Sequence, residues 1–328
     1  MSAEKAKDTD ASEARNAEIL RVATRGVAFG VFLLLLAGAL VTSTESGLAV
    51  PDWPLSYGKV MPPMVGGILY EHGHRLVAAA VSTLVGLELG ALLFFLEGKR
   101  AVKLLAAAAF AAILLQALLG GLTVLLLLPP AVSSAHAALA EIVFALTAVV
   151  ALMCSRTWNE LNNLSSNGAE ARTAFRWTLA ATAAIYVQIV LGAVIRHTGA
   201  GLAIPDFPAA FGGLWPSADE LQRRGVGLHL AHRVGAVVVL ALVLAAVRAL
   251  ERLSTVNPVF AGFAAVWTGL VAIQILLGAL SIWSRKSPPL TAAHLAGGAL
   301  CWVTGVLATV SVGACRNLSN AVSSRIRA

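Results

Sequence analysis

The chain has 328 residues, of which 58% are hydrophobic and only 12% charged, and its mean hydropathy is +0.80. A soluble domain carries roughly 25% charged residues, so this composition excludes a soluble globular protein and predicts an integral membrane protein. The long apolar runs do not alternate as the strands of a membrane β-barrel do, and we therefore expect an all-α fold.

Eight apolar segments are expected to cross the membrane as helices, because each is long enough, at about 20 residues or more, to span a hydrocarbon core. They are predicted at 24–44, 67–96, 101–128, 133–155, 174–196, 226–252, 258–283 and 289–313. Residues 1–23 are polar and mix acids with bases, which is typical of a short cytoplasmic tail and not of a signal peptide. A second cytoplasmic tail is expected at 314–328.

The chain contains an internal repeat. The segment "SGLAVPDWPLSYG" at 46–58 returns 154 positions later as "AGLAIPDFPAAFG", with seven of the thirteen positions identical. Self-similarity over such a distance indicates a duplicated unit. We expect two pseudo-twofold-related four-helix bundles, at 24–155 and 174–313, joined by a polar cytoplasmic linker at 156–173. An even number of spans in each unit gives both units the same orientation in the membrane.

Basic residues predict the orientation. With the N-terminus inside, 16 of the 24 Lys and Arg residues lie on the cytoplasmic side. The positive-inside rule then places both termini in the cytoplasm of a bacterial plasma membrane protein. Because topology explains the net charge of +7, no nucleic-acid partner is expected.

Histidines occur at duplicated positions at the outer ends of the even-numbered spans. His74 and His232 are 158 residues apart, as are His136 and His294. A single histidine in a membrane helix is usually a packing residue, but ionisable groups repeated at membrane depth indicate a functional site. Two imidazoles on facing helices of a four-helix bundle can ligate heme iron from both faces, whereas Zn²⁺ would need further close ligands. The pattern favours two heme sites, one in each bundle.

An acid accompanies only the first histidine pair. The motif "EHGHR" ending at Arg75 corresponds to "HLAHR" ending at Arg233, so Glu71 has His229 as its counterpart. Glu71 lies three residues before His74, on the same helix face. A carboxylate beside a heme suits proton transfer or stabilisation of a developing cation, which a pure electron relay does not need. The alternative is an acid at the loop edge, or a simple partner of Arg75.

Other polar side chains lie close to the predicted ligands. Arg75 and Arg233 are interpreted either as guanidinium groups that hydrogen-bond to heme propionates or as arginines whose side chains extend to the membrane interface. His72 and His229 are additional imidazoles that compete for ligation of the iron.

Two acids and three glutamines fall within the predicted spans. Glu88 and Glu141 are expected to form interhelical hydrogen bonds, and a place on a proton path is the alternative. Gln116, Gln188 and Gln274, which belong to matching segments, are also expected to bond between helices.

The repeated loops are predicted to be lids over the exposed edges of the hemes. Asp52 and Asp206 are placed to cap a turn, while Trp53 and Phe207 provide an aromatic face at the membrane interface.

These motifs together resemble the heme A synthase family. The resemblance rests on the duplicated four-helix unit, on "SGLAVPDWP" and its echo, on "ExxHR" from Glu71 to Arg75, and on His136, His232 and His294. It covers nearly the whole chain from about residue 24 to 313. Some members carry a cysteine pair in the first outer loop, which is absent from 45–66 in this chain.

The resemblance implies an oxidoreductase that converts heme O to heme A by oxidising a porphyrin methyl group to a formyl group in successive hydroxylations. It implies that His74 and His136 hold the substrate heme and that His232 and His294 ligate a retained heme b. It assigns Glu71 as the catalytic carboxylate, which would stabilise a cationic carbon or take its proton. Expected partners are the lipid bilayer, an electron donor or acceptor, and a heme O synthase that supplies the substrate.

Two other classes are weighed against this interpretation. A diheme membrane cytochrome that oxidises a quinol would have the same fold and ligands. A transporter would also suit parallel repeats, but the polar groups here cluster at the outer ends of the helices and not at mid-membrane.

Overall fold

The computed structural model describes residues 2–164 and 168–326, with side chains for 14–164 and 168–315. The named elements of this described part are all helical. The long helices are α1 (Ser2–Ser43), α2 (Gly67–Phe95), α3 (Arg100–Leu125), α4 (Pro130–Met153), α6 (Gly168–His197), α8 (Val226–Leu253), α9 (Val259–Trp283) and α10 (Pro288–Ile326). The short ones are α5 (Arg156–Asn162), the 3₁₀-helix η1 (Ala200–Leu202) and α7 (Ala218–Leu221).

Eight helices in the described chain are long and apolar enough to cross a membrane, which confirms the predicted all-α, multi-pass architecture. The predicted spans differ from the observed helices mainly at three ends. Helix α1 begins at Ser2 and α10 continues to Ile326, so both predicted tails are helical where they are described. Helix α6 begins at Gly168, inside the predicted linker. Ala, Glu, Lys and Arg are good helix formers, so a polar composition marks the end of an apolar span and not the end of a helix.

Two prolines set the starts of the helices that carry predicted ligands. Pro130 and Pro288 open α4 and α10. A proline is tolerated in the first turn, where its missing N–H has no intrahelical partner to lose. His136 and His294 each follow six residues later, which places both in the second turn of their helices.

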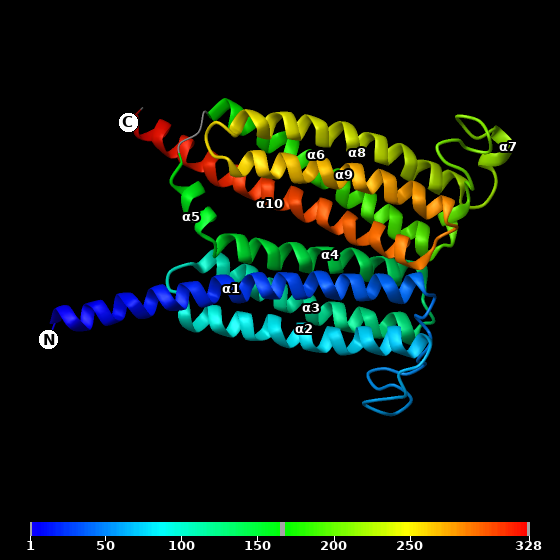
Figure 1. Ribbon diagram of the computed structural model, residues 1–328, viewed down its shortest axis with the longest axis horizontal. Coiled ribbons are helices and arrows are strands. Elements are labelled where there is room, and N and C mark those ends of the chain that lie inside the picture. The colour runs from blue at the N-terminus through cyan, green and yellow to red at the C-terminus, as the bar shows by residue number, and fades with distance from the viewer. Residues whose placement is uncertain (1, 165–167, 327–328) are drawn as a thin grey trace.

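The long helices form two groups that lie side by side (Figure 1). One group contains α1–α4, the other contains α6, α8, α9 and α10, and the groups meet through α1, α4, α6 and α10. Helices α4 and α10 bury at least half of their apolar windows, far more than the other spans, because they lie at this junction. The pseudo-twofold relation of the groups stays a prediction.

Both chain ends lie at one end of the molecule (Figure 1). The two long loops, residues 44–66 and 198–225, lie at the opposite end, which we call the loop end. All four predicted ligand histidines belong to the turns of α2, α4, α8 and α10 nearest the loop end. The fold therefore gathers the repeated motifs at a single level.

Candidate functional site

Each predicted ligand histidine packs against a glycine of a neighbouring helix. The four pairs are His74 with Gly38, His136 with Gly120, His232 with Gly192, and His294 with Gly278. A Cβ atom at any of these glycines would lie 3.1–3.4 Å from the imidazole ring, so a larger residue would crowd the ring. Sequence reasoning missed these glycines. For three of the four, the available signal was the glycine that follows a repeated glutamine by four positions, in "QALLGG", "QIVLGA" and "QILLGA". Gly38 follows no such glutamine.

The two histidines of each predicted pair converge. His136 is within electrostatic range of His74, and His232 is within range of His294. The Nδ1 atoms of all four rings are buried and have no hydrogen-bond partner among the described residues. Buried polar atoms are normally paired, so these nitrogens indicate that a group outside the polypeptide completes the site. Paired imidazoles in glycine-lined positions fit a heme ligated from both faces.

Glutamines support two of the ligand helices. The Nε2 of Gln116 donates to the carbonyl of His136 at 2.8 Å, and that of Gln188 donates to the carbonyl of His232 at 2.7 Å. These bonds confirm the predicted interhelical role for both residues. The Nε2 of Gln274 has no partner in the described chain, so the same prediction is wrong for its amide nitrogen.

Glu71 is only 4% exposed and both of its carboxylate oxygens are engaged. The backbone N–H of Val50 donates to Oε2 at 2.8 Å, and Nη2 of Arg75 donates to Oε1 at 2.6 Å. Val50 belongs to the first repeated loop and is fully buried. Glu71 therefore anchors this loop to α2 as well as forming an ion pair with Arg75.

His229 makes the equivalent contact in the second group. Its Nδ1 accepts a hydrogen bond at 3.2 Å from the backbone N–H of Ile204, which is the repeat counterpart of Val50. His229 is also buried, at 5% exposure. The other additional imidazole, His72, pairs through Nδ1 with Ser56 Oγ at 2.8 Å. Both imidazoles that were considered as competing ligands thus bind loop residues.

Arg75 and Arg233 bind the loops in the same manner. Nη1 of Arg75 donates to the carbonyls of Asp52 and Leu55 at 2.7 and 2.8 Å. Arg233 donates to the carbonyls of Asp206 and Ala209. These bonds use donors that one of the two interpretations of the sequence reserves for heme propionates.

An aspartate closes the turn of each loop. Asp52 accepts from the N–H groups of Tyr57 and Gly58 at 2.7 and 2.8 Å, and Asp206 accepts from those of Phe211 and Gly212 at 2.8 and 2.7 Å. The hydrogen bond from Gly58 is the largest cause of the lowered pKa of Asp52, and the bond from Tyr57 adds to it against the opposing effect of desolvation. Desolvation acts to raise the pKa of Asp206, but the backbone hydrogen bonds outweigh it and the net shift is also downward. The predicted capping function is confirmed for both residues.

The aromatic residues of the two loops differ in their contacts. A Cβ atom on Gly121 would lie 2.6 Å from the indole of Trp53, so this glycine allows Trp53 to pack on α3 next to Gly120. In the second loop the carbonyl of Phe207 accepts from Trp283 Nε1 at 3.0 Å, and the two rings meet edge to face. The first loop is therefore docked directly beside the glycine that contacts His136.

The two acids within the spans have buried carboxylate oxygens without hydrogen-bond partners among the described residues. Neither carboxylate oxygen of Glu88 has a hydrogen-bond partner in the described chain, and the same holds for Oε2 of Glu141. Both side chains are buried, at 5% and 3% exposure. The prediction of an interhelical hydrogen bond is wrong for Glu88.

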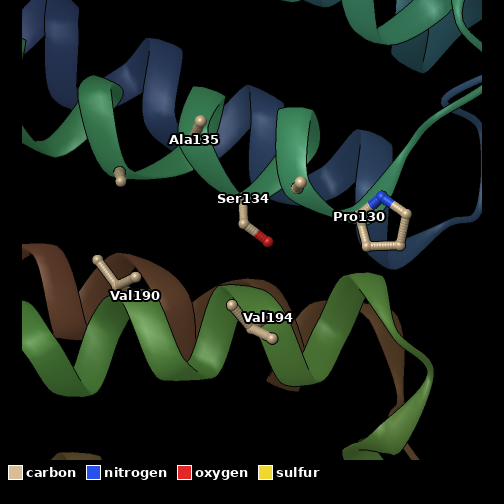
Figure 2. A pocket seen from close by; sticks show the side chains of 7 residues that line it. Pro130, Ser134, Ala135, Val190 and Val194 are labelled. Carbon is tan, nitrogen blue, oxygen red and sulfur yellow. The ribbon is translucent and has the colours of Figure 1, made fainter.

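An apolar groove with a volume of about 440 Å³ lies between the two helix groups (Figure 2). Helix α4 contributes Pro130, Ser134 and Ala135, and α6 contributes Val190 and Val194. The groove has no titratable lining residue, so it provides no group for acid–base chemistry or metal ligation. The chemically competent residues are those at the histidine pairs.

The fold and these residues define a multi-pass membrane protein with two duplicated histidine sites at one end. The family model described as "Cytochrome oxidase assembly protein" matches residues 66–306. A protein named "Heme A synthase" from Symbiobacterium thermophilum is 33% identical, over 76% of this chain and 81% of its own length. Proteins with the same name from Halalkalibacterium halodurans and Lysinibacillus sphaericus are 29% and 27% identical, over 76% and 85% of this chain and 80% and 92% of theirs.

The chain belongs to the heme A synthase family.

Proposed function

We propose that this protein is a heme A synthase, which oxidises a porphyrin methyl group of heme O to the formyl group of heme A for cytochrome oxidase assembly. Family membership supports the reaction. The observation that carries the assignment of residues is the pair of matching histidine sites, of which only one has a buried carboxylate at the position of Glu71.

The two groups of helices are assigned different hemes. His74 and His136 ligate the substrate, heme O, next to Glu71. His232 and His294 ligate a retained heme b, whose iron supplies a one-electron redox centre when bound. The support is the asymmetry of the sites, because a redox relay needs no carboxylate whereas oxidation of a methyl group releases protons.

Glu71 is the catalytic carboxylate in this proposal. The N–H of Val50 and the guanidinium of Arg75 hold its two oxygens in fixed positions, so that the side chain is oriented before the reaction begins. A preoriented anion stabilises positive charge that develops on the methyl carbon, and it can take the proton that leaves. Each hydroxylation adds one oxygen from water and releases two electrons and two protons to external acceptors.

The repeated loops are assigned as lids over the two sites. Arg75 and Arg233 hold the loop carbonyls, while Glu71 and His229 hold the loop N–H groups. We infer that these residues, together with His72, position the loops, and that iron ligation is left to the four glycine-packed histidines.

The protein is assigned to the bacterial plasma membrane, with both termini in the cytoplasm and the heme sites toward the outer face. The excess of Lys and Arg on the terminal side supports this orientation. The common position of the two chain ends is compatible with it.

A direct test is conversion of heme O by the purified protein. The protein is incubated with heme O and an electron acceptor, which takes the electrons that each hydroxylation releases. The hemes are then extracted and separated by chromatography. A synthase yields the hydroxylated and formyl products. Absence of both products from a protein that still undergoes redox cycling would favour the diheme electron-transfer cytochrome.

Glu71→Gln tests the catalytic assignment. We expect conversion to fall by a factor of at least about 100, which is the lower range for loss of a general acid or base. The heme b spectrum should persist, because heme b is assigned to the other helix group. The amide oxygen can still accept from Val50, which keeps the first loop in place. Glu88→Gln, on the same helix, is the matched control and should retain activity. Full activity in the Glu71→Gln protein would reject the assignment.

A further inference from the structure

Arg196 lies within the last membrane-spanning turn of α6 and reaches across to the other helix group. Its Nη2 donates to the carbonyl of Ala39 at 3.2 Å and to the hydroxyl of Ser43, both on α1. Among the residues whose side chains are described, no carboxylate forms an ion pair with Arg196. A cation at membrane depth is costly unless an anion or dipoles compensate it, so Arg196 indicates a further function.

The guanidinium lies beside the second histidine pair. Arg196 follows Gly192 by four residues, so it lies on the same helix face, about one turn of 5.4 Å closer to the loop end. Gly192 is the glycine that contacts His232, and the charge of Arg196 is felt at His294. Arg196 is thus placed about one turn from the glycine that contacts His232, on the side of the loops.

The equivalent helix position beside the first histidine pair is not basic. The residue four positions after Gly38 is Thr42, whose hydroxyl donates to the carbonyls of Gly38 and Ala39 in its own helix. The arginines of the two "HR" motifs donate to loop carbonyls, and Nε of Arg233 has no hydrogen-bond partner among the described residues. An additional guanidinium therefore lies at the boundary between the two helix groups, on the helix whose Gly192 contacts His232.

We propose that Arg196 binds a propionate carboxylate of the heme held by His232 and His294. This inference rests on the proposed function and extends it. Propionates project from one edge of a heme, and a guanidinium about one turn from the glycine that contacts His232 can meet them with paired, charge-assisted hydrogen bonds. Thr42 provides no such charge at the first site. The second heme is consequently retained as a cofactor, whereas the first can be exchanged as substrate and product.

The experiment measures how fast heme leaves the second site. A His74→Ala background restricts ligation by both imidazoles to His232 and His294, and excess apomyoglobin captures the released heme b. We expect Arg196→Gln to release heme about tenfold to a hundredfold faster, as follows from loss of a hydrogen bond to a charged group. The amide can still donate to Ala39 and Ser43, which preserves the contact with α1. Arg196→Lys should lie closer to the wild-type rate.

A second readout separates propionate binding from a purely structural contact. Removing a positive charge beside the heme should lower its midpoint potential in Arg196→Gln, and Lys should restore it. Arg252→Met is the control, because Arg252 lies at the end of α8 opposite to His232. It should change neither the rate of heme release nor the midpoint potential. A release rate and a potential unchanged in Arg196→Gln would overturn the proposal while leaving the synthase assignment intact. Wild-type protein that binds no heme would instead contradict the proposed function.

Discussion

At the scale of single residues, one pair of equivalent positions has different chemistry in the two halves of the molecule. Glu71 and His229 occupy equivalent places and accept hydrogen bonds from equivalent loop N–H groups, of Val50 and Ile204. Only Glu71 also forms an ion pair, with Arg75. The shared contact is explained by docking of the loop, and the difference in charge therefore distinguishes the chemistry of the two sites.

The ligand assignment predicts separate losses of heme. His232→Ala should remove heme b from the purified protein, because an iron without one axial imidazole loses that bond and the site gains a cavity. His74→Ala should retain heme b but bind heme O at least about tenfold more weakly, the effect of losing roughly 1.4 kcal/mol or more. Heme content and type, measured by extraction and chromatography, check both expectations. Retention of both hemes by both variants would contradict the assignment.

At the scale of the elements, the two loops share their turn and their anchors but differ in how they pack on the helices. Asp52 and Asp206 close equivalent turns in the two loops. Trp53 packs directly on Gly121, whereas the corresponding helix position in the second half is Ala279. The first loop thus depends on the absence of a side chain on α3.

Gly121→Ala should displace the first loop. The added methyl would lie 2.6 Å from the indole of Trp53, and such overpacking typically costs about 1–3 kcal/mol. We expect Trp53 to become more accessible to an aqueous fluorescence quencher and conversion of heme O to slow. Gly90→Ala is a suitable control, since a Cβ at Gly90 meets nothing within 4 Å. Unchanged quenching in Gly121→Ala would show that the loop does not depend on this contact.

At the scale of the whole molecule, the packing brings the two halves together at partly buried polar contacts. Tyr186 Oη of α6 donates to the carbonyl of Ala138 in α4 at 3.2 Å, and Arg196 of α6 reaches α1. Both contacts join helices that belong to different repeats. The position of one half therefore constrains the helices that carry the site of the other.

The proposed orientation predicts which loops face outward. Leu214, in the second long loop, is 96% exposed, while Glu97 is exposed in the turn between α2 and α3 at the opposite end. In a Cys154→Ser background, Leu214→Cys should react with a membrane-impermeant maleimide in intact cells. Glu97→Cys should react only after the membrane is permeabilised. The opposite pattern of labelling would reverse the topology.

Much of the architecture and of the candidate site follows from local sequence patterns. The lengths of the apolar segments predict eight spans. The repeated motifs predict the histidine pairs, the carboxylate of Glu71 that occurs in only one repeat, and the capping aspartates. The ends of α1 and α10 were not predicted, because helix propensity continues where hydropathy stops. The glycines facing the histidines were also missed, since a glycine has no side chain whose chemistry signals its contact.

The sequence alone determines that this protein crosses a membrane and that its chemistry is duplicated, because hydropathy and repetition are properties of the chain itself. Only the tertiary structure decides which acceptors each arginine reaches. It shows Arg75 and Arg233 bound to loop carbonyls, whereas Arg196 bridges to α1 beside the second histidine pair. Hydrogen bonds between residues distant in sequence depend on three-dimensional packing, and no local pattern encodes them.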